Sequence, residues 1–226
     1  MRICVVAAQH GEELFGLKVI GRLNRLGASE VLTIVANPEA IAKRRRFLDT
    51  DLNRSYASNE KSREVETAKL IKAQINDFDP SYVIDIHTSH MAVGKTAIVA
   101  HYSECIEALS QALGMETIVI MPKEIADNSL IGCFAEKSVS IELGMGLRSD
   151  KLAEELCRNI YNLQNQPKIT KKQLPRFLVT KTIPKTFKSL KKVVNLEFNK
   201  ELKAYPFLAG ESAYHDIGGF MAKKLN

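Results

Sequence analysis

Short apolar runs recur along the first two thirds of the chain, each followed by a polar or turn-forming segment. Runs of this length and composition are typical of strands buried inside a sheet. They lie at 2–8 (RICVVAA), 30–36 (EVLTIVA), 82–87 (YVIDIH), 95–100 (KTAIVA), 116–121 (ETIVIM) and 138–143 (SVSIEL). The pattern predicts a strand at each of them.

Between these runs, apolar residues return every three or four positions, as they do on one face of an amphipathic helix. Helices are expected over 14–26, 62–78, 103–114 and about 150–165. Gly27 follows the first of them at the position where glycine commonly ends a helix. Strands that alternate with helices predict an α/β fold, with a parallel or mixed sheet flanked by helices.

The composition of the sequence changes at residues 166–176, which read QPKITKKQLPR and are rich in Pro, Gln and Lys. We therefore place a boundary there, between a main domain at 1–165 and a small β-rich C-terminal lobe at 166–226. Short strands are expected in the lobe at RFLVTKTI, VVNLEF and YPFLAG.

Composition and charge narrow the protein class. The 226 residues are 45% hydrophobic, enough for a real core, and no stretch has the length and apolarity of a membrane span. The chain has no signal-peptide pattern, and its four cysteines lack metal-site or disulfide-framework spacing, so we expect a cytoplasmic protein.

The net charge of +6 is unevenly distributed. Residues 151–226 hold 15 basic against 6 acidic side chains, so the positive charge belongs to the C-terminal third. Such charge can steer small acidic substrates, attract polyanions or maintain solubility. No nucleic-acid-binding motif accompanies it, so nucleic acid is not the expected partner. The sequence is compatible with a homo-oligomer.

Four polar stretches stand where predicted strands or the loops after them end: QHGEE, DLNR, HTSH and ELGMG. In open α/β sheets, ligand-binding loops lie beyond the carboxyl ends of the strands. We therefore expect the four stretches to meet at one site.

The first and third stretches offer a metal site. His10 and Glu13 are three residues apart, which lets both side chains reach one ion where a strand runs into a helix, and His87 is the natural third ligand. Two imidazoles and a carboxylate suit Zn²⁺, with a fourth position left for water. The alternative is structural: His10 and Glu13 would favour the start of the helix, and His87 would be a hydrogen-bonded core residue.

Two further groups of residues could carry chemistry. Glu142 ends an apolar strand, where it could serve as a general base, or pair with Lys137 or Arg148 in a salt bridge. The charged loop around DLNR holds Arg46, Asn53 and Arg54, which could bind an oxyanion and a carboxylate, or simply form a solvated surface.

Taken together, these stretches resemble the aspartoacylase and succinylglutamate desuccinylase family of zinc-dependent amidases. The resemblance rests on five motifs in the family's order: HGEE, NPEAIAKRRRFLDTDLNR, DIHTS, SIELG and, near the C-terminus, YPFLAGESAYH. It implies a carboxypeptidase-like mixed sheet flanked by helices, with the C-terminal lobe contributing to the substrate pocket.

The resemblance also implies a role for each site residue. Zinc would be held by His10, Glu13 and His87. Catalysis would use Glu142 as general base and Arg46 to polarise the scissile carbonyl, and the amino-acid part of the substrate would be bound by Asn53, Arg54 and Tyr214. The expected activity is hydrolysis of a small N-acyl amino acid.

Three features depart from the family pattern. Glu12 replaces the usual asparagine and adds a negative charge near the metal. An aspartate-specific member carries a basic side chain about ten residues before the general base, where this chain has Gly132 nearest the spot. The C-terminal lobe is also short for the family, which would leave the site more open and the acceptable acyl or amino portion of the substrate larger.

Two other functions fit the residues. A zinc carboxypeptidase acting on small peptides would share the ligand geometry. A non-catalytic binding protein would use the basic C-terminal lobe for an acidic partner and keep a degenerate metal pocket. The DLNR stretch and the C-terminal tyrosine segment favour the deacylase.

Overall fold

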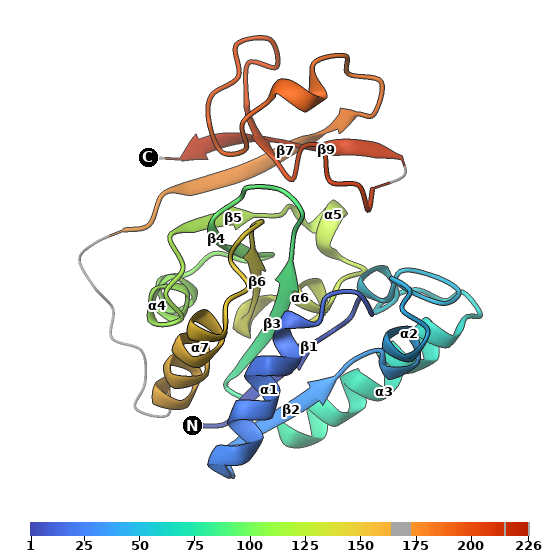
Figure 1. Cartoon of the computed structure of the whole chain (residues 1–226), viewed down its shortest axis with the longest axis vertical. Coiled ribbons are helices and arrows are strands. Elements are labelled where there is room, and N and C mark those ends of the chain that lie inside the picture. The colour runs from blue at the N-terminus through green and yellow to red at the C-terminus, as the bar shows by residue number, and fades with distance from the viewer. Residues whose placement is uncertain (164–172, 215, 226) are drawn as a thin grey trace.

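The protein is described by a computed structural model that places residues 1–163, 173–214 and 216–225. Their strands form one nine-stranded sheet in the order β2-β1-β3-β6-β4-β5-β7-β9-β8 (Figure 1). The strands are β1 (Ile3–Ala7), β2 (Val31–Val35), β3 (Tyr82–Thr88), β4 (Lys95–Val99), β5 (Thr117–Ile120), β6 (Ser138–Leu143), β7 (Arg176–Pro184), β8 (Tyr205–Phe207) and β9 (Ile217–Leu225). The α-helices are α1 (Phe15–Leu26), α2 (Pro38–Ala42), α3 (Arg63–Phe78), α4 (Glu104–Ala112), α5 (Lys123–Ala126), α6 (Leu130–Cys133) and α7 (Asp150–Asn162). Short 3-10 turns are η1 (Leu52–Arg54), η2 (Ala135–Lys137) and η4 (Leu190–Lys192).

Helices cover both faces of the sheet because successive strand residues point to opposite sides. On one face, α1, α4 and α7 pack on residues such as Val5, Ile84 and Ile141. On the other face, α3 packs on Cys4 and Val83. Figure 1 shows α1 and α7 next to each other, with α3 on the far side of β2. The predicted α/β layers are confirmed, as are the six strands and four helices expected in this part of the chain.

The sheet is mixed, as predicted. β1, β2, β3 and β6 run parallel, whereas β4 is antiparallel to β6 and parallel to β5. Because β1, β3 and β6 are adjacent and parallel, their carboxyl ends lie at one edge of the sheet. The register places His87 on β3 opposite Glu142 on β6.

The C-terminal strands extend this same sheet. β7 pairs in parallel with β5, with Ile118 opposite Arg176, and β9 then pairs with both β7 and β8 (upper part of Figure 1). Residues 166–172, most of the predicted boundary segment at 166–176, lie outside the described residues. The division into domains at residues 1–165 and 166–226 stays a prediction.

The structure differs from the sequence expectations at several segments, among them the short helices α5 and α6, which were not predicted. VVNLEF was expected as a strand, but Leu196 has a φ of 64° and the Asn195 amide binds the backbone of Ala209, so the segment turns instead of extending. Strand β9 was not predicted. Neither was α2, although Asn37 caps it by accepting a hydrogen bond from the Ala40 amide.

Within the described part of the chain, no helix combines the length and apolarity that crossing a bilayer requires.

The core packing generates a stability prediction. Leu109 on α4 is fully buried, whereas Leu70 on α3 is 65% exposed. Leu109→Ala should lower the free energy of unfolding by about 2 to 5 kcal/mol, because it leaves a cavity, and Leu70→Ala should change it by less than about 1 kcal/mol. Urea unfolding followed by circular dichroism measures both. Equal effects of the two substitutions would contradict this packing.

Candidate metal centre and substrate pocket

The turn after β1 delivers two of the predicted ligands to the edge of the sheet. Ala8 leaves the strand with a φ of 57°, and His10 and Glu13 follow before α1 begins. Both side chains are buried. Gly11 lies between them because a Cβ there would stand only 2.5 Å from the Arg45 carbonyl oxygen. The tight turn therefore aims an imidazole and a carboxylate inward.

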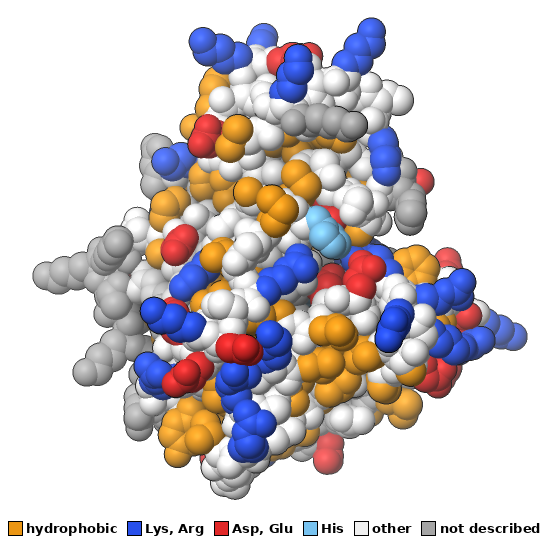
Figure 2. Space-filling model, viewed as in Figure 1, with side chains coloured by type: hydrophobic (Ala, Val, Ile, Leu, Met, Phe, Trp, Pro, Cys, Tyr) orange, Lys and Arg blue, Asp and Glu red, His pale blue; other side chains and the backbone are white. Residues whose placement is uncertain are grey.

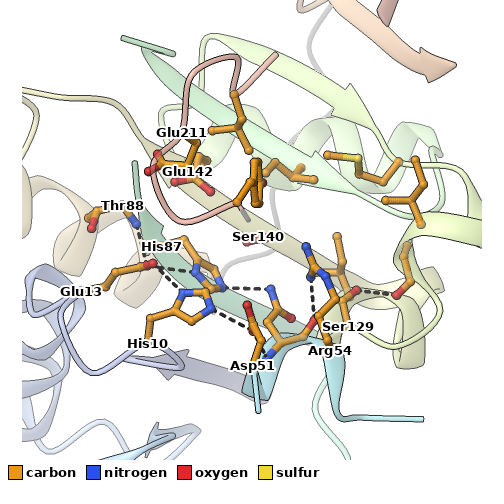
Figure 3. A pocket seen from close by; sticks show the side chains of 18 of the residues that line it. His10, Glu13, Asp51, Arg54, His87, Thr88, Ser129, Ser140, Glu142 and Glu211 are labelled. Atoms are coloured by element: carbon orange, nitrogen blue, oxygen red, sulfur yellow. Dashed lines mark hydrogen bonds and ion pairs between the residues drawn. The ribbon is translucent and has the colours of Figure 1, made fainter. Parts of the chain in front are cut away.

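The third predicted ligand joins them from β3. The carboxylate of Glu13 lies 2.6 Å from His10 Nδ1 and 3.0 Å from His87 Nδ1, and it accepts a hydrogen bond from the Thr88 amide (Figure 3). One ligand atom from each of His10, Glu13 and His87 lies within 4.8 Å of the other two. The structure brings the three predicted ligands together.

An aspartate orients each imidazole from its other side. His10 Nε2 lies 3.1 Å from Asp51 Oδ1, and His87 Nε2 lies 2.8 Å from Asp85 Oδ2. Metal-binding histidines are commonly held this way, since a carboxylate on one ring nitrogen fixes the ring and makes the other nitrogen a better ligand. The donor set and its supporting carboxylates therefore fit a divalent metal such as Zn²⁺.

Sequence reasoning missed both supporting aspartates. A signal for Asp85 existed, because residues two apart on a strand point to the same face, as Asp85 and His87 do. Asp51 lies in the DLNR stretch, where it also caps η1 by accepting a hydrogen bond from the Asn53 amide.

Charge is tightly coupled in this cluster. Burial opposes ionisation of the two histidines, but the carboxylates around them outweigh it and raise the pKa of both His10 and His87. Burial likewise opposes ionisation of Glu13, yet the two histidines hold its pKa well below the ordinary value. The cluster attracts positive charge, which is what a cation site requires.

Glu142 faces the cluster from the neighbouring strand and is 8% exposed. Among the described residues its carboxylate has no hydrogen-bond or ion-pair partner. Burial raises the pKa of Glu142 to about 8; His87 and His10 oppose this rise, whereas Glu13 and Glu211 add to it.

The alternative salt bridges of Glu142 are not formed. Lys137 pairs instead with Asp79, and Arg148 donates to the Ser89 carbonyl oxygen. The position of Glu142 is thus explained by neither of the proposed structural partners.

Arg46 reaches the site from the loop after α2, and its guanidinium forms ion pairs with three carboxylates. Its guanidinium lies 3.3 Å from Glu12, 3.4 Å from Glu13 and 3.7 Å from Asp51. The Gly11 amide donates to the Arg46 carbonyl oxygen, so the two loops are also joined through the backbone. Glu12 therefore acts on the site through Arg46.

The three predicted substrate-binding residues line the same pocket as the proposed ligands His10, Glu13 and His87. Asn53 accepts a hydrogen bond from the Leu130 amide, which fixes η1 against α6. Arg54 donates to the Asn53 carbonyl oxygen. Tyr214 arrives from the C-terminal segment and packs edge-on against Phe220, with ring centroids 5.6 Å apart.

The C-terminal segment is attached beside the metal cluster through Glu211, a residue that sequence reasoning left without a role. Its carboxylate accepts hydrogen bonds from the Ser89 hydroxyl at 2.6 Å and from the His90 amide at 3.0 Å. Burial opposes ionisation of Glu211, but these hydrogen bonds outweigh it and lower the pKa. Glu211 lies three residues before Tyr214 and thus holds the tyrosine segment over the pocket.

The assembled pocket opens where the C-terminal segment meets the main body of the molecule. Figure 2 shows a histidine at this junction with both acidic and basic side chains close to it, while other lysine and arginine side chains are scattered over the surface. In Figure 3, Glu13, His10 and His87 lie on one side of the pocket, and Arg54 and Ser129 lie on the other.

Comparison with known proteins is consistent with this architecture. Residues 1–163 match the model of the succinylglutamate desuccinylase/aspartoacylase catalytic domain. A probable aspartoacylase of Prochlorococcus marinus (strain MIT 9313) is 32% identical over 118 residues, a stretch that covers 44% of this chain and 38% of that relative. The chain spans 36% to 55% of the lengths of the curated relatives it matches.

Solved structures share the fold over the whole chain. Succinylglutamate desuccinylase from Chromobacterium violaceum aligns with a TM-score of 0.79 at 19% identity, covering 100% of this chain and 85% of that one. A variant of murine aminoacylase 3 aligns with a TM-score of 0.77 at 16% identity, covering 100% of this chain and 94% of that one. With its catalytic-domain match over most of its length, the chain belongs to the succinylglutamate desuccinylase/aspartoacylase family.

Proposed function

We propose that the protein is a zinc-dependent amidohydrolase that removes the acyl group from a small N-acyl amino acid. The observation that carries the proposal is the meeting of His10, Glu13 and His87 with an unpaired buried carboxylate, Glu142, in one pocket. Membership of an amidase family supports it.

Zn²⁺ would be held by the Nδ1 atoms of His10 and His87 and the carboxylate of Glu13, with Asp51 and Asp85 fixing the two rings. When bound, it would polarise the scissile carbonyl and make water at the site easier to deprotonate.

The protein side chains divide the remaining work. Arg54 and Asn53 would bind the substrate α-carboxylate, and Tyr214 would close the pocket over it. Arg46 would stabilise the negative charge that develops on the acyl oxygen. Glu142, which has no described partner to compete for it, would take the proton from the attacking water. As the water oxygen bonds to the acyl carbon and the C–N bond breaks, Glu142 would pass that proton to the leaving amine nitrogen.

The first experiment measures amine release from a panel of N-acyl amino acids by the zinc-loaded protein, with and without a chelator. We expect release from at least one member, and we expect the chelator to abolish it. Release of C-terminal residues from short peptides instead would favour the carboxypeptidase, and no release from either panel would contradict the proposed class of reaction.

Metal content separates the ligands from the proposed base. His10→Ala and His87→Ala should each lose zinc and activity, because two protein ligands hold the ion far less tightly than three. Glu142→Gln should keep zinc close to the wild-type amount and lose activity by about 100-fold or more. Elemental analysis after dialysis measures the metal. Full zinc occupancy in the His10→Ala His87→Ala double variant would rule out this site.

Glu211 is expected to act as a positioning residue. Glu211→Ala should raise KM by about tenfold, because Ser89 and His90 lose their shared acceptor and the Tyr214 segment loosens. Glu211→Gln keeps one acceptor oxygen and should have a smaller effect. Zinc content should not change in either variant. A fall in kcat with KM unchanged would show that Glu211 acts on the chemistry instead of on substrate binding.

A further inference from the structure

The pocket has two chemically different halves. One half holds the metal cluster with its carboxylates and arginines, as described above. The other half is apolar. Its wall, here called the apolar wall, is formed by Ile98, Met121, Ile125, Ile131, Leu208 and Phe220.

The apolar wall is part of the hydrophobic core, so packing holds its side chains in place. Five of its six residues are 2–7% exposed, and all six belong to or pack against one hydrophobic cluster that joins β4, β5, α5 and α6 to the C-terminal strands. Gly132 follows Ile131 in α6, at a position where a Cβ would stand 2.0 Å from the Ala126 carbonyl oxygen. No side chain can therefore extend from that position into the wall without moving α5.

Cations available to a substrate are few. Among the described residues that line the pocket, the basic side chains other than histidine are Arg46 and Arg54. Arg46 already pairs with Glu12, Glu13 and Asp51. Arg54 is left to bind a carboxylate, and it lies beside Asn53, whose side chain contacts the α6 backbone next to the apolar wall.

Carboxylates outnumber these arginines. Glu13, Asp51, Glu142 and Glu211 all line the pocket, and Glu12 adds a fifth carboxyl group at Arg46. A second carboxylate on the substrate, seated away from the metal ligands, would lie against apolar side chains without a cation. Burying it would be costly.

We propose that the substrate carries a single carboxylate and that its amino-acid side chain is uncharged and apolar, seated against the apolar wall. This inference rests on the proposed function and names its substrate class. The α-carboxylate on Arg54 and Asn53 places the adjoining side chain next to the 125–131 segment. Derivatives of leucine, methionine and similar amino acids fit this arrangement, and derivatives of aspartate and glutamate do not.

A near-isosteric substrate pair tests the inference. N-acetyl-leucine and N-acetyl-aspartate have side chains of similar size, with two methyl groups in place of two carboxylate oxygens. For the zinc-loaded protein we expect kcat/KM to be at least about 100-fold higher for the leucine derivative, because the aspartate side chain would be buried without a partner. Equal values, or a preference for the aspartate derivative, would overturn the inference while leaving the deacylase function in place.

A charge placed in the apolar wall should reverse part of the preference. Ile125 is half-buried at the end of the wall, so arginine can be accommodated there. Ile125→Arg should lower the leucine-to-aspartate ratio of kcat/KM by about tenfold or more, and Ile125→Gln should lower it less. Leu70→Arg, which adds the same charge on the exposed face of α3, should leave the ratio unchanged. An equal shift in Leu70→Arg would mean that overall charge, and not the apolar wall, sets the preference.

Binding to the zinc-loaded Glu142→Gln variant separates failure of the inference from failure of the proposed function. Calorimetric titration should give tighter binding of N-acetyl-leucine than of N-acetyl-aspartate. If this preference appears although the wild-type protein hydrolyses neither compound, the inference stands and the proposed reaction falls. If neither compound binds, or if the aspartate derivative binds more tightly, the inference is wrong.

Discussion

The parallel pairing of β1, β3 and β6 is the constraint on which the site depends. It brings the ends of three strands that are distant in sequence to one edge of the sheet, and each end carries part of the chemistry. His10 and Glu13 follow β1, His87 is the next-to-last residue of β3, and Glu142 lies opposite it on β6. A shift of one residue in the register would turn His87 away from Glu13, because successive strand residues face opposite sides.

That constraint has an electrostatic cost, which the neighbouring residues offset. Glu13 and Glu142 are buried close together, and Asp51 and Asp85 add further negative charge around the two imidazoles. Backbone amides, histidines and Arg46 balance part of this charge. The negative charge that stays unbalanced fits a cation-binding site better than a network held together by hydrogen bonds alone. The same charge balance assigns a role to Glu12, because its carboxylate competes with Glu13 and Asp51 for the guanidinium of Arg46.

Most of the fold in the first two thirds of the chain could be predicted from the sequence, because hydrophobic periodicity and helix-capping signals were clear there. The proximity of the three proposed ligands could be predicted as well, because the carboxyl ends of adjacent parallel strands lie at the same edge of the sheet. Asp85 carried a local signal, because it lies two residues before His87 on the same strand, whereas Glu211 was harder to predict, because its role depends on a contact across 122 residues of sequence. The C-terminal strands were only partly predicted, because side-chain hydrogen bonds from Asn195 and a left-handed Leu196 override the β-like composition of VVNLEF.

Because Glu211 attaches the segment around Tyr214 to the pocket, the parts of the site form at different stages of folding. The three proposed metal ligands all lie within the first 87 residues, so they can come together early, but the pocket is not closed until the segment around residues 211–214 docks onto Ser89 and His90. Such long-range contacts form late in folding, because closing a large loop costs entropy. During synthesis on the ribosome, the proposed metal ligands could therefore come together well before the pocket can hold a substrate.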